Sequence, residues 1–169
     1  PYEAQRDFLG ISGFHGYWPN DFQKTEPNFG DRDKLRELVK EAHDRGIKVM
    51  LDVVLNHTSY GHPFTTDPEK KSWFNANGNI SGLGQSSMEN GSLCGLPDLN
   101  QNNPEVKRHL IEIHKDWLQD VDAFRMDALR HMPQSFLREF NQEMHQAKPG
   151  FFAVGEAFWL ESNFVAGYQ

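Results

Sequence analysis

Cysteine and long apolar runs are both scarce in this chain of 169 residues. No stretch comes near the roughly 18 uninterrupted apolar residues of a membrane-spanning helix. The first ten residues, PYEAQRDFLG, also lack the basic start and the apolar run of a signal peptide. We therefore expect no membrane partner. The single cysteine, Cys94, excludes an internal disulfide and leaves the redox compartment open.

Positive charge is in the minority. Lys and Arg number 17 against 24 Asp and Glu, which gives a formal net charge of −7, and the acidic residues are spread along the chain. Binding to a nucleic-acid backbone depends on clustered Lys and Arg, so we do not expect a nucleic-acid partner. Aromatic residues make up 12% of the chain although the mean hydropathy is low at −0.70. Aromatic faces among many polar groups suit a carbohydrate-binding surface.

Helical and strand patterns alternate along the chain. Apolar residues at helical spacing predict helices over 31–45, 103–119 and 133–147. Apolar runs predict strands over 47–56, 122–127 and 151–156. This order predicts an α/β fold with parallel strands and right-handed helical crossovers, either an open sheet or part of a (β/α)8 barrel. A complete barrel takes roughly 250 residues, so a barrel here would be a partial one.

Two of these elements carry more detailed expectations. In the first helix the apolar face consists of Leu35, Leu38, Val39 and Ala42. The run over 47–56 is almost continuously apolar, which is typical of a parallel strand that is covered on both faces. Between it and the next helix, residues 58–95 show no clear periodicity, and structureless loops of this length are uncommon in compact domains. We expect a functional excursion or a small subdomain there.

Each predicted strand ends in polar or charged residues. The first ends with Asp52, Asn56 and His57, the second contains Arg125 and Asp127, and the third ends at Glu156. In parallel α/β folds the carboxyl ends of the strands meet at the ligand site, so these side chains should share one cleft. A single such residue is more often a cap or a satisfied polar group, but all three strands repeat the pattern.

Two of these carboxylates, Asp127 and Glu156, suit the nucleophile and the general acid of glycoside cleavage. A neighbouring Arg125 would keep Asp127 ionised, and an apolar setting beside Phe158 and Trp159 would raise the pKa of Glu156. The alternative is an ion pair of Arg125 that only satisfies buried charges. Spacing alone does not decide between the two interpretations.

Five short segments resemble the ordered motifs of one enzyme family. They are FHGYW (14–18), DVVLNH (52–57), LPDLN (96–100), FRMDALRH (124–131) and VGEAF (154–158). Together they resemble the motifs of the α-amylase family of retaining glycoside hydrolases, and the resemblance covers essentially the whole chain. The resemblance implies a partial (β/α)8 (TIM) barrel that acts on starch-like α-1,4-glucans or maltooligosaccharides.

By this resemblance, Asp127 matches the catalytic nucleophile and Glu156 the general acid and base. Arg125 would hold the nucleophile in position, and Asp52 would in turn hold Arg125. On the sugar side, the resemblance assigns substrate contacts to His15, Tyr17, Trp18 and His57, with Tyr17 as the aromatic platform. Arg130 and His131 match positions that bind sugars on the leaving-group side, where the family usually has Lys and His. Arg130 keeps the charge of Lys and changes the hydrogen-bond geometry.

The family also implies an inserted domain B between the third strand and the third helix of the barrel. We therefore expect partial barrel over 1–57, the insertion over 58–102 and further barrel over 103–169. A structural calcium ion commonly lies between insertion and barrel, and the match gives its ligands as Asn56, Asp98 and the carbonyl of His131. Without the resemblance, capping and turn formation would explain Asn56 and Asp98 equally well.

The family has a third catalytic carboxylate on its seventh strand, and no Asp follows Glu156 here. We therefore expect the chain to be a fragment of a larger enzyme, inactive alone, with a parent that is secreted by family habit. The alternatives are a cyclodextrin glucanotransferase or maltogenic amylase, or a non-catalytic amylase-like module that binds sugar or a partner. An unrelated open-sheet binding domain would require five chance matches. The oligomeric state stays open.

Overall fold

The structure is a computed structural model that describes residues 2–4, 10, 13–158 and 162–168. Its centre is a parallel sheet of three strands in the order β3-β4-β5. The strands are β3 (Met50–Val53), β4 (Ala123–Met126) and β5 (Phe152–Gly155). Helix α3 (Pro104–Trp117) connects β3 to β4 after a long excursion, and α4 (Gln134–Ala147) connects β4 to β5. The predicted α/β alternation with parallel strands is confirmed.

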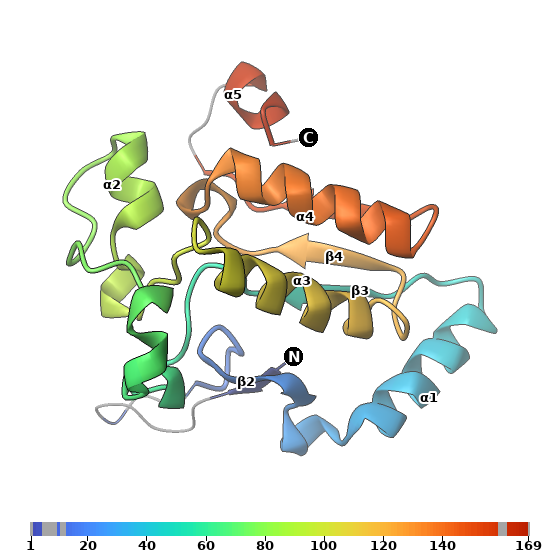
Figure 1. The fold of residues 1–169 in the computed structure, drawn as a ribbon. Coiled ribbons are helices and arrows are strands. Elements are labelled where there is room, and N and C mark those ends of the chain that lie inside the picture. The colour runs from blue at the N-terminus through green and yellow to red at the C-terminus, as the bar shows by residue number, and fades with distance from the viewer. Residues whose placement is uncertain (1, 5–9, 11–12, 159–161, 169) are drawn as a thin grey trace.

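The helices begin where their sequences supply a cap. The Asn103 side chain accepts from the amide of Glu105, and Pro104 takes the first turn of α3, where its missing N–H costs nothing. Figure 1 shows α3 and α4 running beside each other along the sheet. Their inward faces form the core against Phe124, with Trp117 and Phe140 fully buried. Of the helices in the described part of the chain, none is long and apolar enough to cross a bilayer.

Among the described residues, helices cover one face of the sheet and leave the other exposed, which corrects the expectation for the run over 47–56. Leu51 and Val53 are buried on the helix side, but Met50 is 39% exposed, and Phe152 and Val154 share its open face. Asp52 and Arg125 are register partners on that face. Apolar and polar side chains therefore share this open face, because Met50 lies on it together with Asp52 and Arg125.

Helix α1 (Arg32–His43) begins at the predicted cap, since the Asp31 side chain accepts from the amide of Lys34. Its predicted apolar face is only partly correct. Val39 is buried, whereas Leu38 is 59% exposed. Helical spacing places Leu38 next to Val39 around the helix, but α1 meets the rest of the described structure along a narrow stripe only.

A hairpin near the N-terminus was not predicted. Strand β1 (Tyr2–Ala4) pairs antiparallel with β2 (Pro19–Thr25). The sequence PNDFQKT of β2 has neither regular alternation nor β-branched residues except its last, so no local pattern marks it. Tertiary contact holds it instead, because the indole of Trp117 donates to the carbonyl of Phe22 at 2.7 Å.

The long excursion after β3 folds as a series of short turns. It contains the 3₁₀ helices η2 (Pro63–Thr65), η3 (Pro68–Trp73) and η4 (Leu93–Gly95), and the short helix α2 (Gln85–Asn90). Isolated bridges His57–Asp98 and Phe74–Leu99 join its two ends. Figure 1 places α2 beyond the carboxyl ends of the strands. Three further short helices are η1 (Pro27–Phe29), η5 (Leu129–His131) and α5 (Ser162–Ala166).

One carboxylate fastens α1 and the start of β3 to β4. Asp122 accepts from the amide of Val49 at 2.8 Å, and its other contacts are His43 Nε2 at 2.7 Å and Lys48 Nζ at 3.3 Å. Burial opposes ionisation of this side chain, which is 13% exposed, but the three partners outweigh burial and lower the pKa of Asp122 to about 2.

This lowered pKa predicts a stability contribution that depends on pH. The contribution is full above the ordinary pKa of 3.8 and is lost as the pH falls through about 2. It amounts to about 2 kcal/mol at most. We expect Asp122→Asn, which can still accept from Val49, to lose this pH-dependent part. Urea unfolding between pH 5 and pH 2, followed by tryptophan fluorescence, measures how the free energy of unfolding changes with pH. The protein to use is the longest natural polypeptide that contains this sequence, which we call the parent polypeptide.

The matched control is Asp44→Asn, because Asp44 forms only an exposed pair with Lys40 on α1. Such a pair contributes about 0.5 kcal/mol or less. Equal slopes of stability against pH for Asp122→Asn and the unmodified protein would contradict the assignment.

Candidate active site

The hydrogen bonding of the sheet continues past the strands and sets the position of two carboxylates. The amide of Asp127 donates to the carbonyl of Val53 at 3.0 Å, and the amide of Glu156 donates to that of Met126 at 2.9 Å. Both residues are therefore fixed at the carboxyl edge of the sheet by the same ladder that holds β3, β4 and β5 together. The expectation that the strand ends converge is correct for these residues.

One guanidinium joins three carboxylates at this edge. Arg125 Nη1 lies 2.8 Å from Asp52 Oδ1 and 2.7 Å from Asp127 Oδ1, and Nη2 lies 3.0 Å from Glu156 Oε2. Burial alone would lower the pKa of Arg125, but its carboxylate partners raise it well above the ordinary value. The Arg125 ion pairs foreseen from spacing are thus present, and they occur within the candidate site rather than in place of it.

The protonation pattern of the two carboxylates is the reverse of the expected one. Burial, together with the neighbouring Glu156, raises the pKa of Asp127 to about 6 despite the contact with Arg125. The smaller effect of burial on Glu156 is outweighed by the amide of Ala128, by Asp127 and by Arg125, so the pKa of Glu156 is lowered. Phe158 lines the same pocket as Glu156 but is itself 66% exposed, and Trp159 lies outside the described residues.

Aromatic residues gather on one side of the carboxylates. The hydroxyl of Tyr17 donates to Asp52 Oδ2 at 2.8 Å, and its ring, 5.8 Å from the guanidinium carbon of Arg125, is 37% exposed. The ring of His15 stacks on Tyr17 with an interplanar angle of 16°, and it packs edge to face with Trp18, with the two ring centroids 4.8 Å apart. The structure therefore brings the predicted His15, Tyr17 and Trp18 together as one surface.

His57 lies beneath this surface and is 2% exposed. Its Nε2 is 3.0 Å from the carbonyl oxygen of Tyr17, so Nε2 carries the proton and donates. Burial lowers the pKa of His57 to about 4, against the opposing effect of this hydrogen bond. His57 is thus neutral near pH 7 and supports the backbone of Tyr17.

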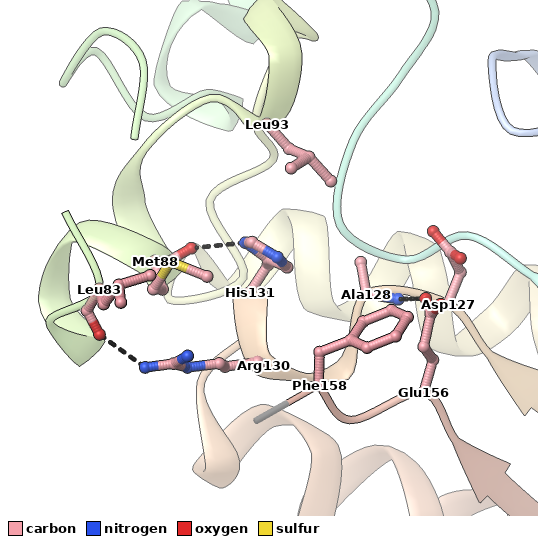
Figure 2. Close-up of a pocket in the computed structure, with 9 residues that line it drawn as sticks. All are labelled: Leu83, Met88, Leu93, Asp127, Ala128, Arg130, His131, Glu156 and Phe158. Carbon is pink, nitrogen blue, oxygen red and sulfur yellow. Dashed lines mark hydrogen bonds between the residues drawn. The ribbon is translucent and has the colours of Figure 1, made fainter. Parts of the chain in front are cut away.

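A pocket of about 460 Å³ opens on the other side of the carboxylates (Figure 2). Asp127, Ala128 and Glu156 line it from the strand ends. The opposite wall belongs to the excursion, and its side chains are Leu83, Met88 and Leu93. Sequence reasoning missed these three residues, because no periodicity within 77–95 distinguishes a pocket wall from a loop.

Arg130 and His131 also line the pocket, and both bind the excursion. Figure 2 shows Arg130 extended toward Leu83, whose carbonyl accepts from Nη2 at 2.5 Å, and His131 Nδ1 beside the carbonyl of Met88 at 3.1 Å. Both residues therefore line the same pocket as Glu156 while they bond to the excursion. Burial lowers the pKa of His131, so Nδ1 is the donor of a neutral ring.

The residues expected to bind calcium show oxygen atoms without partners. Asn56 and Asp98 are buried, and in the described part of the chain Asn56 Oδ1 and Asp98 Oδ1 have no hydrogen-bond partner. Asp98 Oδ2 accepts from Asn75 at 2.8 Å, yet burial raises the pKa of Asp98 to about 7. Buried oxygens left unpaired are costly, and such a set fits a hard cation. The described residues contain no cluster of three His, Cys, Asp or Glu side chains that could hold a metal, so a cation here would need amide and carbonyl oxygens.

Comparison with known proteins identifies this arrangement. The family described as "Alpha amylase, catalytic domain" matches residues 2–80 and 89–169. The beta/alpha-amylase of Paenibacillus polymyxa is 36% identical over 92% of this chain and 14% of the relative. The cyclomaltodextrin glucanotransferase of Klebsiella oxytoca is 30% identical over 95% of this chain and 28% of the relative.

Among solved structures, the α-amylase from Geobacillus thermoleovorans, complexed with acarbose, superposes with a TM-score of 0.91 at 44% identity. The match covers 99% of this chain and 38% of that one. The chain thus spans well under half the length of these relatives. Its three-stranded parallel sheet is part of a (β/α)8 barrel, as the sequence predicted.

The reversed protonation pattern gives a direct test of the carboxylate pair. We expect Glu156→Gln to lower the pKa of Asp127, because the substitution removes a neighbouring negative charge that disfavours ionisation of Asp127. Carboxyl-carbon NMR titration of the parent polypeptide labelled at Asp measures this shift.

The control for this titration is Glu112→Gln, an exposed residue of α3 that pairs with Lys115. It should leave the Asp127 titration unchanged. A pKa of Asp127 that stays the same or rises in Glu156→Gln would show that the two carboxylates are not coupled.

Proposed function

Because this chain belongs to the α-amylase family of retaining glycoside hydrolases, we propose that it carries the nucleophile and the acid/base of an enzyme that cleaves α-1,4-glucosidic bonds in starch-like glucans. The observation that carries this proposal is the Arg125 cluster. One guanidinium contacts both Asp127 and Glu156 at adjoining strand ends, directly beside a pocket. Two carboxylates held close together suit a double displacement with retention.

In the proposed reaction Asp127 attacks the anomeric carbon and forms a covalent glycosyl-enzyme intermediate. Glu156 gives its proton to the leaving oxygen as the glycosidic bond breaks. It afterwards takes a proton from water or from an acceptor hydroxyl, whose oxygen bonds to the anomeric carbon and displaces Asp127. This role requires the shared proton on Glu156, whereas the unliganded geometry favours it on Asp127. A sugar that enters between them and separates Glu156 from Arg125 and the Ala128 amide removes the contacts that lower the pKa of Glu156.

The two sides of the carboxylate pair receive different parts of the glucan. We place the cleaved sugar over the exposed ring of Tyr17, with His15 and Trp18 beside it. Contact between His57 and that sugar requires its hydrogen bond to Tyr17 to open. The leaving part of the glucan occupies the pocket lined by Arg130 and His131.

Hydrolysis and transfer are both compatible with this site. The matched relatives include a beta/alpha-amylase and a cyclomaltodextrin glucanotransferase. We favour α-amylase-type hydrolysis because the Geobacillus α-amylase shares 44% identity over nearly the whole chain. Cyclic dextrins among the products from starch would favour a glucanotransferase, and linear maltooligosaccharides favour hydrolysis or a maltogenic relative.

A non-catalytic sugar-binding or interaction module is the second class of function. A module of this kind has no need for a nucleophile and an acid held on one guanidinium, and here both are present. Absence of acarbose from the Tyr17 side of the parent polypeptide in a soaked crystal would favour the non-catalytic alternative.

The activity is proposed for the parent polypeptide. The chain by itself has three parallel strands with an exposed inner face, and it spans 14% to 38% of the relatives described above. We propose that residues 58–102 form the family's inserted domain B and that the chain alone hydrolyses little or no starch.

Calcium is proposed as a structural ion between this insertion and the sheet. Asn56 Oδ1 and Asp98 Oδ1 are buried oxygens without partners, and the carbonyl of His131 would be a third ligand. The ion would neutralise the buried carboxylate of Asp98 and join the two ends of the insertion to the barrel.

The different proposed roles of Asp127 and Glu156 predict different losses of activity on substrates with different leaving groups. Glu156→Gln should lower kcat on starch by roughly 10²-fold or more, since an acid is needed to expel a sugar. The same variant should still release fluoride from α-maltosyl fluoride, because fluoride leaves without protonation. Asp127→Asn should lose both activities. Colorimetric assay of reducing sugar and a fluoride electrode make the two measurements.

The 169-residue chain alone, assayed in parallel, should show little or no starch hydrolysis. Equal losses on both substrates in Glu156→Gln would contradict the acid role of Glu156. Retained turnover in Asp127→Asn would contradict its role as nucleophile.

The calcium proposal predicts thermal stabilisation by a specific ion. At a concentration 100-fold above its dissociation constant, calcium should raise the Tm of the parent polypeptide by about 5 °C or more. Asp98→Asn should weaken this response, because it removes the only carboxylate of the set. Differential scanning calorimetry after chelation and after readdition of calcium measures it.

Magnesium is the matched control, since its strict octahedral geometry suits a site with few waters poorly. Stabilisation by calcium that is undiminished in Asp98→Asn would place the ion elsewhere.

A further inference from the structure

The helix that forms one wall of the pocket has no buried side chain. Helix α2 (Gln85–Asn90) is six residues long, and its N-cap Gly84 offers no side-chain cap. Leu83, just before it, is 65% exposed. Because most helical stability in proteins comes from burial of an apolar face, neither packing nor capping explains why α2 holds its position.

Hydrogen bonds hold α2 instead: Ser87 and Asn90 accept from Ser81 and Asn77 within the excursion, and further bonds join α2 to the turn after Asp127. Arg130 Nη2 donates to the carbonyl of Leu83 at 2.5 Å, and Gln85 Nε2 donates back to the carbonyl of Arg130 at 3.3 Å. His131 Nδ1 adds a bond of 3.1 Å to the carbonyl of Met88. We call these three bonds between α2 and η5 the latch. The bond from Arg130 is charge-assisted and therefore the strongest of the three.

The latch determines where one wall of the pocket lies. Leu83 and Met88, whose carbonyls accept from Arg130 and His131, both line the pocket that holds Asp127 and Glu156. Figure 2 shows both residues on the excursion, on the opposite side of the pocket from Glu156. A shift of α2 therefore moves the apolar side chains that face the proton donor, while Arg125 and the ladder hold the carboxylates themselves.

We propose that Arg130 is a positioning residue that, through the carbonyl of Leu83, fixes the pocket wall against which sugar units on the leaving-group side bind. This inference rests on the proposed function. It assigns Arg130 an effect on the binding of long substrates and acceptors, and none on the displacement at Asp127. A direct hydrogen bond from Arg130 to the sugar is the competing assignment, and the experiment separates the two.

Two variants open the latch from opposite sides. Arg130→Met removes the donor to Leu83, and Gln85→Leu removes the return bond from a residue that does not line the pocket. In the parent polypeptide we expect each to raise KM for maltopentaose, by about tenfold for Arg130→Met as a charge-assisted bond is lost. Turnover of α-maltosyl fluoride, whose leaving group does not reach the wall, should change less than about twofold in Gln85→Leu, because Gln85 does not line the pocket and binding energy used only by the leaving part is not engaged.

The double variant shows whether Arg130 acts through α2. If both residues serve the same latch, the combined KM effect will be no larger than that of Arg130→Met alone, because residues in one network are not additive. Arg130→Lys, which restores one charged donor, should recover part of the loss. Amide hydrogen exchange of residues 84–90 without any ligand should accelerate in Arg130→Met and in Gln85→Leu.

The matched control is Arg138→Met. Arg138 also donates to a carbonyl, that of Gly167 at 2.6 Å, but it lies outside the pocket. It should change neither KM nor exchange in residues 84–90. If Arg130→Met does not fold, Arg130→Lys and Gln85→Leu provide the same test.

The proposal is overturned if Gln85→Leu leaves KM for maltopentaose unchanged while Arg130→Met raises it, since Arg130 would then contact the sugar directly. It is also overturned if exchange in residues 84–90 is unchanged in both variants. An unmodified parent polypeptide that turns over neither maltopentaose nor α-maltosyl fluoride would instead refute the proposed function and leave the exchange experiment as the test of the latch.

Discussion

The guanidinium of Arg125 is the centre on which the site depends. Asp52, Asp127 and Glu156 come from three neighbouring strands, and without a cation between them three carboxylates this close would repel one another. The ladder fixes the backbone of Asp127 and Glu156, so the strands supply rigidity and Arg125 supplies charge balance. Three carboxylates on one guanidinium leave two surplus negative charges, which favours a proton bound between Asp127 and Glu156.

The sequence predicted the parts of the fold that depend on interactions between residues close together in the sequence. The caps at Asp31 and Asn103 marked helix starts within a residue, because a side chain that satisfies orphan amides must sit at the helix end. It did not predict β2, whose hydrogen bond partner is the distant Trp117, and it placed Leu38 on a buried face. It also predicted that both faces of β3 are covered, because an apolar run alone does not distinguish a covered face from an exposed one.

For the site, the sequence predicted which residues lie together but not the protonation states of Asp127 and Glu156. Convergence of strand ends follows from topology, so Asp127 and Glu156 were found together. Their protonation depends on which carboxylate is more buried and which accepts the amide of Ala128, and no motif encodes either fact. Arg130 was predicted from a motif as a sugar contact, but its bond to Leu83 depends on a partner 47 residues away in a segment without periodicity.

Polar and aromatic contacts hold the excursion after β3 at two places. Near Tyr17, the rings of Tyr60 and Trp18 pack edge to face with their centroids 5.1 Å apart. The hydroxyl of Tyr60 also donates to the carbonyl of Cys94, the residue after Leu93, at 2.8 Å. At the second place the latch holds α2. Leu93 and Leu83, which line the same pocket, are thus positioned by different partners. Neither set of contacts is part of the ladder or of the Arg125 cluster. Separate interactions therefore position the pocket wall formed by the excursion and the two carboxylates Asp127 and Glu156.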